Sequence, residues 1–176
     1  TNMKLWYVLA GLSAVGIAVT SVVAHKKKKK ENNKMIAIGS DHGGIELKEQ
    51  MIEHLKKRGI ECKDVGCYSK ESCDYPVYAK KVAGEILSGE CEQGILICGT
   101  GIGMSMAANK IKGIRAALCG DCFSAQMTKE HNNANVLCLG ARVIGSELAF
   151  RIADTFIDSK FSNDERHIRR INMLEQ

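Results

Sequence analysis

From residue 35 to the end of the chain, short apolar runs alternate with longer stretches of helical periodicity, and this pattern strongly constrains the fold. Such alternation is typical of βα units that build a parallel sheet with helices on both faces. We expect strands at residues 35–38, 61–65, 94–98, 115–119 and 135–139. Helices are expected at residues 45–57, 75–88, 102–110, 123–130, 147–158 and 165–174. The sequence therefore predicts a three-layer α/β/α, Rossmann-like domain with a five-stranded parallel sheet.

The N-terminal segment has a different pattern. Residues 5–24 carry no charged side chain and are mostly apolar, about the length of helix that crosses a ~30 Å hydrocarbon core. Lysines fill residues 26–30 after this run, whereas only Lys4 precedes it, the reverse of a cleavable signal peptide. We expect residues 1–34 to form a membrane anchor with a Lys-rich linker, and residues 35–176 to form a cytoplasmic domain tethered to the membrane. An uncleaved secretory signal, or an extension absent from the mature protein, is the alternative.

The charge distribution bears on the class of partner. Residues 1–31 hold six lysines and one glutamate, which account for the whole net charge of +5. The folded domain is neutral overall, so nucleic-acid binding loses its main support. Several of the eight cysteines lie within apolar runs, which favours reduced thiols in a cytosolic compartment over a disulfide framework.

Reactive side chains follow the predicted strands. In open parallel sheets, ligands bind beyond the carboxyl ends of the strands. Four of the five predicted ends combine glycine with such side chains: Asp41 and His42 after the first, Cys98 and Thr100 at the third, Cys119 and Cys122 at the fourth, and Arg142 after the fifth. A carboxylate, an imidazole, a thiol and a guanidinium are therefore expected at one edge of the sheet.

The glycine-rich segment 99–103 lies between a predicted strand and a predicted helix, where small residues let backbone amides approach an anionic oxygen. A purely structural tight turn explains the same spacing. Cys98 directly precedes this segment, in a position that favours a thiolate able to act as a base. The alternative is that Cys98 is a small buried hydrophobic residue with no chemical role. A redox or metal role for Cys119 and Cys122 is disfavoured, because they straddle a strand end and no second pair offers zinc geometry.

Two further candidates lie nearer the C-terminus. His131 ends a predicted helix, where it can move a proton near neutral pH or cap the last carbonyl groups. Residues 166–170 form a dense basic cluster, which suits either a phosphate clamp or a solvated helix face beside Asp164 and Glu165.

Several motifs, in order, resemble ribose-5-phosphate isomerase type B and its galactose-6-phosphate isomerase relatives over residues 35–171. They include Gly-Ser-Asp-His-Gly-Gly at 39–44, Asp-Tyr-Pro at 74–76, Gly-Ile-Leu-Ile-Cys-Gly-Thr-Gly-Ile-Gly at 94–103, Ala-Ala-Asn-Lys at 107–110, Gly-Ile-Arg-Ala at 113–116, His-Asn at 131–132, Leu-Gly-Ala-Arg-Val-Ile-Gly at 139–145 and Arg-His at 166–167. Residues 1–34 depart from this family, whose members are ordinarily soluble cytosolic enzymes.

The resemblance implies an aldose-ketose isomerase that interconverts ribose 5-phosphate and ribulose 5-phosphate through a cis-enediolate, with no metal or organic cofactor. It implies Cys98 as the base at C2, His131 as the residue that opens the furanose ring and Asp41 as the partner of His131. Thr100 and the backbone of residues 99–103 are implied to stabilise the enediolate. Substrate or phosphate ligands are implied at His42, Gly99, Gly101, Ile102, Gly103, Asn132, Arg142, Arg166 and Arg170. The resemblance also implies a homodimer with shared active sites.

Three alternatives stay open. A hexose-6-phosphate isomerase acting on galactose or allose phosphates would use the same chemistry, although Cys98 favours a self-sufficient pentose-phosphate enzyme. A sugar-phosphate-binding module without turnover is disfavoured by the combination of Asp41, Cys98, Thr100 and His131. A thiol oxidoreductase would depend on Cys119 and Cys122.

Overall fold

The computed structural model describes residues 35–176, and the chain from Lys34 to Gln176 forms one compact unit. The predicted membrane span at residues 5–24 lies outside the described residues. Within residues 35–176, no helix is both long enough and apolar enough to cross a bilayer.

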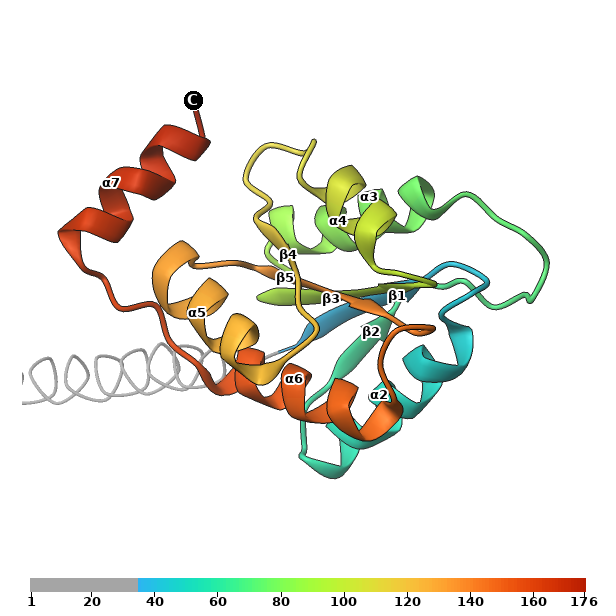
Figure 1. Ribbon diagram of the computed structural model, residues 1–176. Coiled ribbons are helices and arrows are strands. Elements are labelled where there is room, and N and C mark those ends of the chain that lie inside the picture. Colours follow the sequence, from blue (N-terminus) through green and yellow to red (C-terminus); the bar gives the residue numbers. More distant parts are fainter. Residues whose placement is uncertain (1–34) are drawn as a thin grey trace, which may run out of the picture. The chain divides into compact units, whose positions relative to one another are not determined.

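Five parallel strands form one sheet in the order β2-β1-β3-β5-β4 (Figure 1). The strands are β1 (Ile36–Ser40), β2 (Cys62–Asp64), β3 (Gln93–Cys98), β4 (Ala116–Leu118) and β5 (Val136–Gly140). The helices are α2 (Ile45–Lys57), α3 (Tyr75–Leu87), α4 (Ile102–Ala108), α5 (Cys122–Asn132), α6 (Ser146–Asp158) and α7 (Glu165–Leu174). The prediction of a three-layer α/β/α domain with a five-stranded parallel sheet is confirmed.

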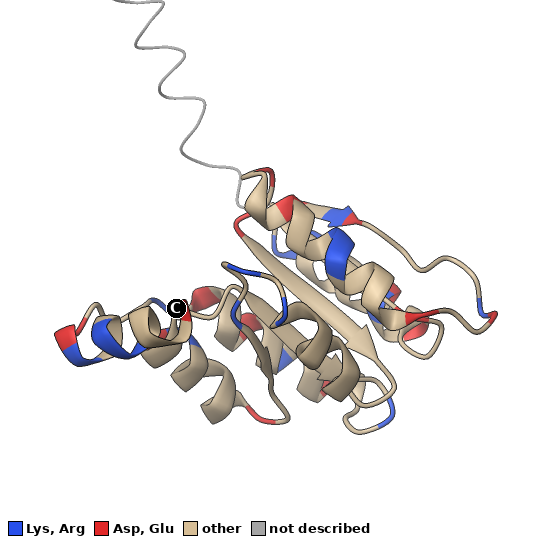
Figure 2. Cartoon of the chain, turned by 90° about the horizontal axis from the view of Figure 1, so that it is seen from above, with Lys and Arg blue, Asp and Glu red and all other residues tan. Residues whose placement is uncertain are grey.

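Helices bury both faces of the sheet, which explains why the three central strands read as nearly continuous apolar runs. On one face, Met51 of α2 and Phe156 of α6 are fully buried against Ile95 and Leu137. On the other face, helices α3 and α4 cover Leu96 and Cys138. Helix α7 lies outside these layers, next to α5, and His167 is its one buried residue (Figure 1). Figure 2 shows the strands largely free of charge and α7 carrying residues of both signs.

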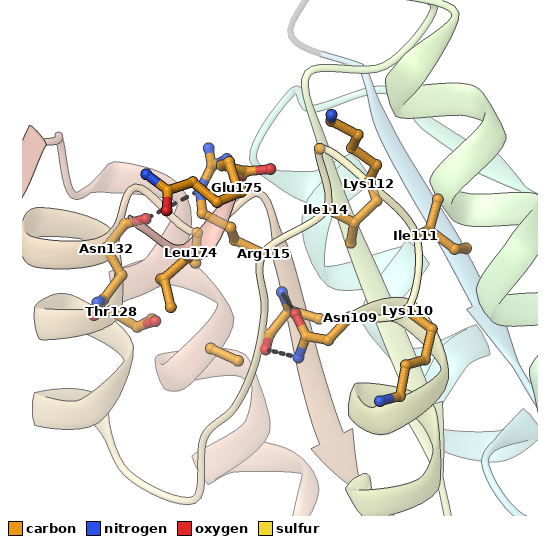
Figure 3. Close-up of a pocket in the computed structure, with 15 residues that line it drawn as sticks. Asn109, Lys110, Ile111, Lys112, Ile114, Arg115, Thr128, Asn132, Leu174 and Glu175 are labelled. Atoms are coloured by element: carbon orange, nitrogen blue, oxygen red, sulfur yellow. Dashed lines mark hydrogen bonds and ion pairs between the residues drawn. The ribbon is translucent and has the colours of Figure 1, made fainter. Parts of the chain in front are cut away.

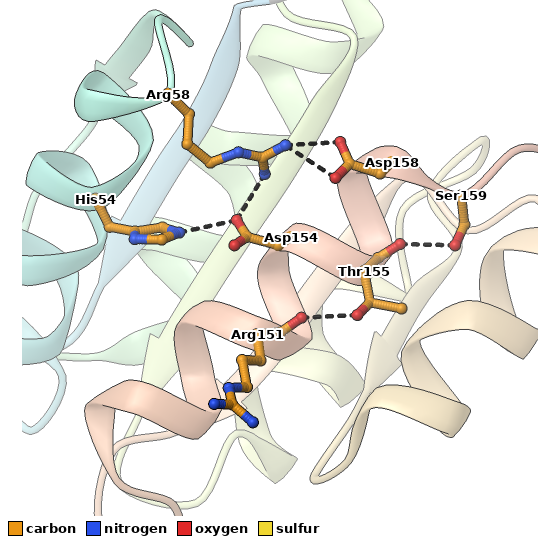
Figure 4. Close-up of polar contacts among 7 residues, drawn as sticks. All are labelled: His54, Arg58, Arg151, Asp154, Thr155, Asp158 and Ser159. Atoms are coloured by element: carbon orange, nitrogen blue, oxygen red, sulfur yellow. Dashed lines mark hydrogen bonds and ion pairs between the residues drawn. The ribbon is translucent and has the colours of Figure 1, made fainter.

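Ion pairs tie helix α2 to its neighbours. Arg58 donates to both Asp154 and Asp158 of α6, at 2.6 and 2.8 Å, and His54 Nε2 lies 2.8 Å from Asp154 Oδ1 (Figure 4). On the same helix the fully buried Lys48 contacts both carboxylate oxygens of Asp64 at 2.7 Å. The first contacts join α2 to α6, and the Lys48–Asp64 pair joins α2 to β2 at the edge of the sheet.

Some predicted boundaries were wrong by one or two residues. Helix α4 ends at Ala108 rather than at residue 110, because the Asn109 side chain exchanges two hydrogen bonds of 2.8 Å with the Ala116 backbone (Figure 3). Helix α5 begins at Cys122, since Asp121 Oδ1 accepts from the Ser124 N–H at 2.7 Å. It continues to Asn132, so His131 lies within the helix.

Candidate active site

The loop after β3 directs a backbone amide at a cysteine sulfur. Cys98 ends β3 and is 5% exposed, and the Gly101 N–H donates to its Sγ at 3.1 Å. Gly101 has a φ of +77°, and a Cβ there would lie 2.9 Å from the Leu139 carbonyl carbon. Only glycine fits this conformation without strain, and the conformation is what brings the amide to the sulfur. The arrangement places the Cys98 sulfur at the start of the glycine loop, within hydrogen-bonding distance of a backbone amide.

The rest of this loop presents polar groups at the start of α4. Thr100 is exposed, and its Oγ1 accepts from the Ile102 N–H at 3.3 Å. The ring of Tyr75 lies against Gly103, where a Cβ would come within 2.8 Å of it. Backbone amides and a hydroxyl therefore stand beside Cys98, as donors that an oxyanion requires.

The loop after β1 packs against this glycine loop. Asp41 is buried, and its Oδ1 accepts from the Gly43 N–H at 2.9 Å. A Cβ built on Gly43 would lie 3.5 Å from Gly99 N and 3.5 Å from Arg142 Nη2. Neighbouring His42 accepts at Nδ1 from the Cys73 N–H at 3.2 Å, which leaves its Nε2 to carry the proton in the neutral ring.

Arg142 joins the two loops from the end of β5. Its backbone N–H donates to the Gly99 carbonyl at 3.0 Å, and its side chain lies along Gly99, with Cδ 3.5 Å from a Cβ built there. A cavity of about 550 Å³ opens beside it, with His42, Lys70 and Ser146 in its lining. The structure thus brings Asp41, His42, Cys98 and Arg142 to one edge of the sheet.

His131 and Asn132 lie at the opposite edge. They end α5, which leads into the start of β5, where Val136 pairs with Gly94. Cys98 pairs with Gly140 at the other end of that strand, roughly 13 Å away along the sheet at 3.3 Å per residue. Asn132 lines a different cavity of about 580 Å³, beside Arg115 (Figure 3). One chain therefore does not bring His131 to Cys98 or Asp41.

Helix α7 adds cationic groups beside His131. The ring of His167 lies 4.4 Å from that of His131, centroid to centroid, and its Nδ1 is 2.7 Å from Ser162 Oγ. Burial, together with the nearby charges of His131 and Arg166, lowers the pKa of His167. Arg166 and Arg170 are exposed on the same helix. The basic cluster and His131 thus form one group at this edge.

A comparison with known families decides the class of protein. Residues 36–174 match the family model for ribose/galactose isomerase.

The chain belongs to this isomerase family.

Individual relatives agree over nearly their whole length. The isomerase is 47% identical to ribose-5-phosphate isomerase B of Escherichia coli over 141 residues, which cover 80% of this chain and 94% of that protein. It is 42% identical to galactose-6-phosphate isomerase subunit LacB of Clostridium acetobutylicum, over 81% and 82% of the two chains. Among solved structures, a ribose 5-phosphate isomerase of Thermotoga maritima matches with a TM-score of 0.80 and 53% identity, covering 82% of this chain and 99% of that one.

The two cysteines of the C-x-x-C pair in the isomerase lie in different surroundings. Cys119 is buried, and burial together with Asp121 raises its pKa to about 11, whereas Cys122 is the first residue of α5. Among residues 35–176, no three His, Cys, Asp or Glu side chains stand close enough to hold a metal ion.

Sequence reasoning left three residues near these groups without a role. Tyr75 covers Gly103, Lys70 lines the cavity beside Arg142, and His167 contacts His131. Tyr75 belongs to the Asp-Tyr-Pro motif and His167 to the Arg-His motif, but the spacing of a motif does not reveal which residues its side chains will contact. Lys70 belongs to a loop with no periodic pattern and had no sequence signal.

Proposed function

We propose that this isomerase interconverts ribose 5-phosphate and ribulose 5-phosphate, with Cys98 as the base that removes the C2 proton. The observation that carries the proposal is the 3.1 Å hydrogen bond from Gly101 N–H to Cys98 Sγ. Abstracting a proton next to a carbonyl needs a positioned base and donors for the charge that then develops on oxygen. Cys98 supplies the first, and Thr100 with the amides of residues 99–103 supplies the second.

The cationic groups near this loop suit the phosphate end of the substrate. Arg142 spans Gly43 and Gly99, and its guanidinium can form paired hydrogen bonds with phosphate oxygens. His42 offers an Nε2–H, because its Nδ1 is occupied by the Cys73 amide. These two side chains are proposed to orient the sugar phosphate over Cys98.

A second copy of the chain is proposed to complete each active site. Distance separates four of the residues implied by the resemblance from Cys98 of their own chain, because they stand at the far edge of the sheet: His131, Asn132, Arg166 and Arg170. An apolar surface adjoins the glycine loop: Ile102, Met106, Leu118 and Phe123 are large, exposed side chains of α4, β4 and α5. Exposed apolar patches of this kind mark protein interfaces. A homodimer through this surface would let His131 of one copy open the sugar ring above Cys98 of the other.

Turnover of ribose 5-phosphate by the full chain tests the reaction and the base together. We expect Cys98→Ala to lower kcat by about a thousandfold, within the range for loss of a general base. Cys122→Ala, which removes a half-buried thiol outside the site, should leave kcat unchanged. Both variants should keep the native circular dichroism spectrum.

The same assay measures the substrate preference when galactose 6-phosphate and allose 6-phosphate are compared with ribose 5-phosphate. Turnover of a hexose phosphate alone, still dependent on Cys98, would keep the mechanism and replace the substrate. Absence of turnover on all three sugars by a folded protein would favour the binding-module alternative.

Membrane attachment through residues 5–24 is proposed separately. It is supported by the uncharged apolar run and the lysines at 26–30. The full chain should sediment with membranes after alkaline carbonate extraction, whereas residues 34–176 should stay in the supernatant. Release of the full chain by carbonate would contradict a spanning helix.

A further inference from the structure

Two cysteines and a tyrosine form a contact cluster beside the proposed phosphate ligand His42. The side chains of Cys67, Cys73 and Tyr78 lie close enough together to shift one another's pKa. The Tyr78 ring also packs on Gly66, where a Cβ would lie 3.1 Å from it. Neither thiol belongs to the isomerase site described above.

The backbone holds Cys67 firmly at the end of β1. Its N–H donates to the Ser40 carbonyl at 2.8 Å, and the Ser40 N–H donates to the Gly66 carbonyl at 2.7 Å. Its Sγ donates to the Ser69 carbonyl at 3.1 Å, and the side chain is 4% exposed. The backbone of Cys67 is therefore bonded to Ser40, which lies two residues before His42 in the chain.

Cys73 connects the cluster to His42 directly. Its backbone N–H donates to His42 Nδ1 at 3.2 Å, and its Sγ lies 3.9 Å from the same nitrogen. Residues 68–72 between the two cysteines are all exposed, so the segment has room to adjust. Any movement of Cys73 toward Cys67 would act on the hydrogen bond that fixes the His42 tautomer.

We propose that Cys67 and Cys73 form a peroxide-sensitive thiol pair, and that its oxidation to an internal disulfide weakens sugar-phosphate binding through His42. The effect on binding rests on the proposed function, whereas formation of the disulfide does not depend on it. The Cys67 thiolate attacks one oxygen of the peroxide, which breaks the O–O bond and leaves Cys67 as a sulfenic acid. The Cys73 sulfur then displaces the sulfenic oxygen, so the two thiols lose two electrons and the peroxide ends as two water molecules.

The protonation states of the cluster suit this order of steps. Burial opposes ionisation of Cys67, but hydrogen bonds from Tyr78, the Ser69 backbone and Cys73 outweigh it and lower its pKa. Burial and the bond to Cys67 raise the pKa of Cys73, which stays a thiol. The hydrogen bond to Cys67, followed by burial, raises the pKa of Tyr78, so its hydroxyl remains a donor. By contrast, burial raises the pKa of Cys62 and Cys119 to about 11.

The geometry also indicates why oxidation would reach His42. A disulfide requires its two sulfurs to stand about 2.05 Å apart, much closer than two sulfur atoms that are not bonded to each other. Because Cys67 is fixed to Ser40, most of the movement falls on Cys73 and its neighbours. Loss of one hydrogen bond to His42 should raise KM roughly threefold to tenfold while kcat changes little.

Mass spectrometry after peroxide treatment tests the pair, on the full chain and on the Cys67→Ser, Cys73→Ser and Cys122→Ser variants. We expect a peptide linking residues 67 and 73 in the parent and in Cys122→Ser, and its disappearance after dithiothreitol. Absence of that link, or pairing of either cysteine with another residue, would overturn the proposal. This readout does not depend on turnover, so failure of the proposed function is a separate outcome.

Kinetics on the same samples test the link to His42. KM for ribose 5-phosphate should rise on oxidation of the parent, recover with dithiothreitol, and stay constant in Cys73→Ser. A loss of kcat in both the parent and Cys73→Ser would indicate oxidation of Cys98, which is a different effect from the rise in KM. A disulfide that forms with no change in KM would contradict the coupling to His42.

Discussion

The two edges of the sheet are built in different ways. At the carboxyl edge, the loops after β1, β3 and β5 touch one another through glycine backbone, with Gly44 and Gly140 so close to neighbouring carbonyls that a Cβ would come within 2.6 Å. At the other edge, α7 buries one residue and its end is held by the ion pair between Arg115 and Glu175. The first edge is a closely packed cluster of loops within one chain. The second presents the groups that the proposed dimer would bring to a neighbouring copy.

The substitution with the largest expected effect on activity lies at the carboxyl edge of the sheet. A Cβ at position 140 would meet the Thr100 carbonyl oxygen at 2.6 Å, so Gly140→Ala must push the loop away from Cys98. We expect kcat/KM for ribose 5-phosphate to fall about a hundredfold, because small displacements of reacting groups have effects of this size. Steady-state kinetics with a thermal unfolding curve measures both consequences.

Gly84→Ala is the matched control for that substitution. Gly84 lies within α3, and nothing lies within 4 Å of a Cβ built there. Its kinetics should stay close to those of the parent. Equal losses in the two variants would show that the close loop contact does not position the site.

A smaller effect is expected where α7 ends. Glu175 Oε1 lies 2.6 Å from Arg115 Nη1, and both side chains are partly exposed (Figure 3). Glu175→Gln should cost about 0.5 kcal/mol, which corresponds to roughly twofold faster amide exchange in α7. Hydrogen exchange should rise there and stay unchanged in β3. Glu49→Gln, an exposed glutamate of α2, is the control; faster exchange throughout the domain would contradict a local role.

The smallest expected effect concerns pH. Burial and nearby cations lower the pKa of His167, so the folded chain binds its proton less readily than the unfolded chain does. Stability linked to this group is therefore fully present above the ordinary histidine pKa of about 6.5 and is lost as pH falls from there toward the lower folded value. The thermal midpoint should drop between pH 7.5 and 5.5, and by less in His167→Gln. An identical drop in both proteins would remove His167 as the cause.

Much of the fold follows from local sequence patterns. Helix α2 runs from Ile45 to Lys57 as expected, because its apolar positions recur at helical spacing after a pair of glycines. Boundaries set by side chains from elsewhere were missed: Asn109 ends α4 by bonding to Ala116, seven residues further on. The ion pair between buried Lys48 and half-buried Asp64 had no sequence signal, since a lysine in a helix ordinarily faces solvent.

The candidate site was predictable in one part only. Asp41, Cys98 and Arg142 follow strands, and the rule for carboxyl ends of parallel strands places them together. His131 and Asn132 precede a strand, so the same rule places them at the opposite edge. Their grouping with Cys98 came from family resemblance, which does not say which chain supplies each residue.

Active-site complementation tests most directly the central claim that each active site joins Cys98 of one copy to His131 of another. Cys98→Ala and His131→Ala are each expected to be inactive on ribose 5-phosphate. In a two-fold dimer that combines them, one site carries both substitutions and the other carries neither. Random mixing should therefore restore about a quarter of parent activity, since half the dimers are hybrids with one intact site. Hybrid dimers that form and stay inactive would show that His131 and Cys98 act within the same chain, contradicting the account.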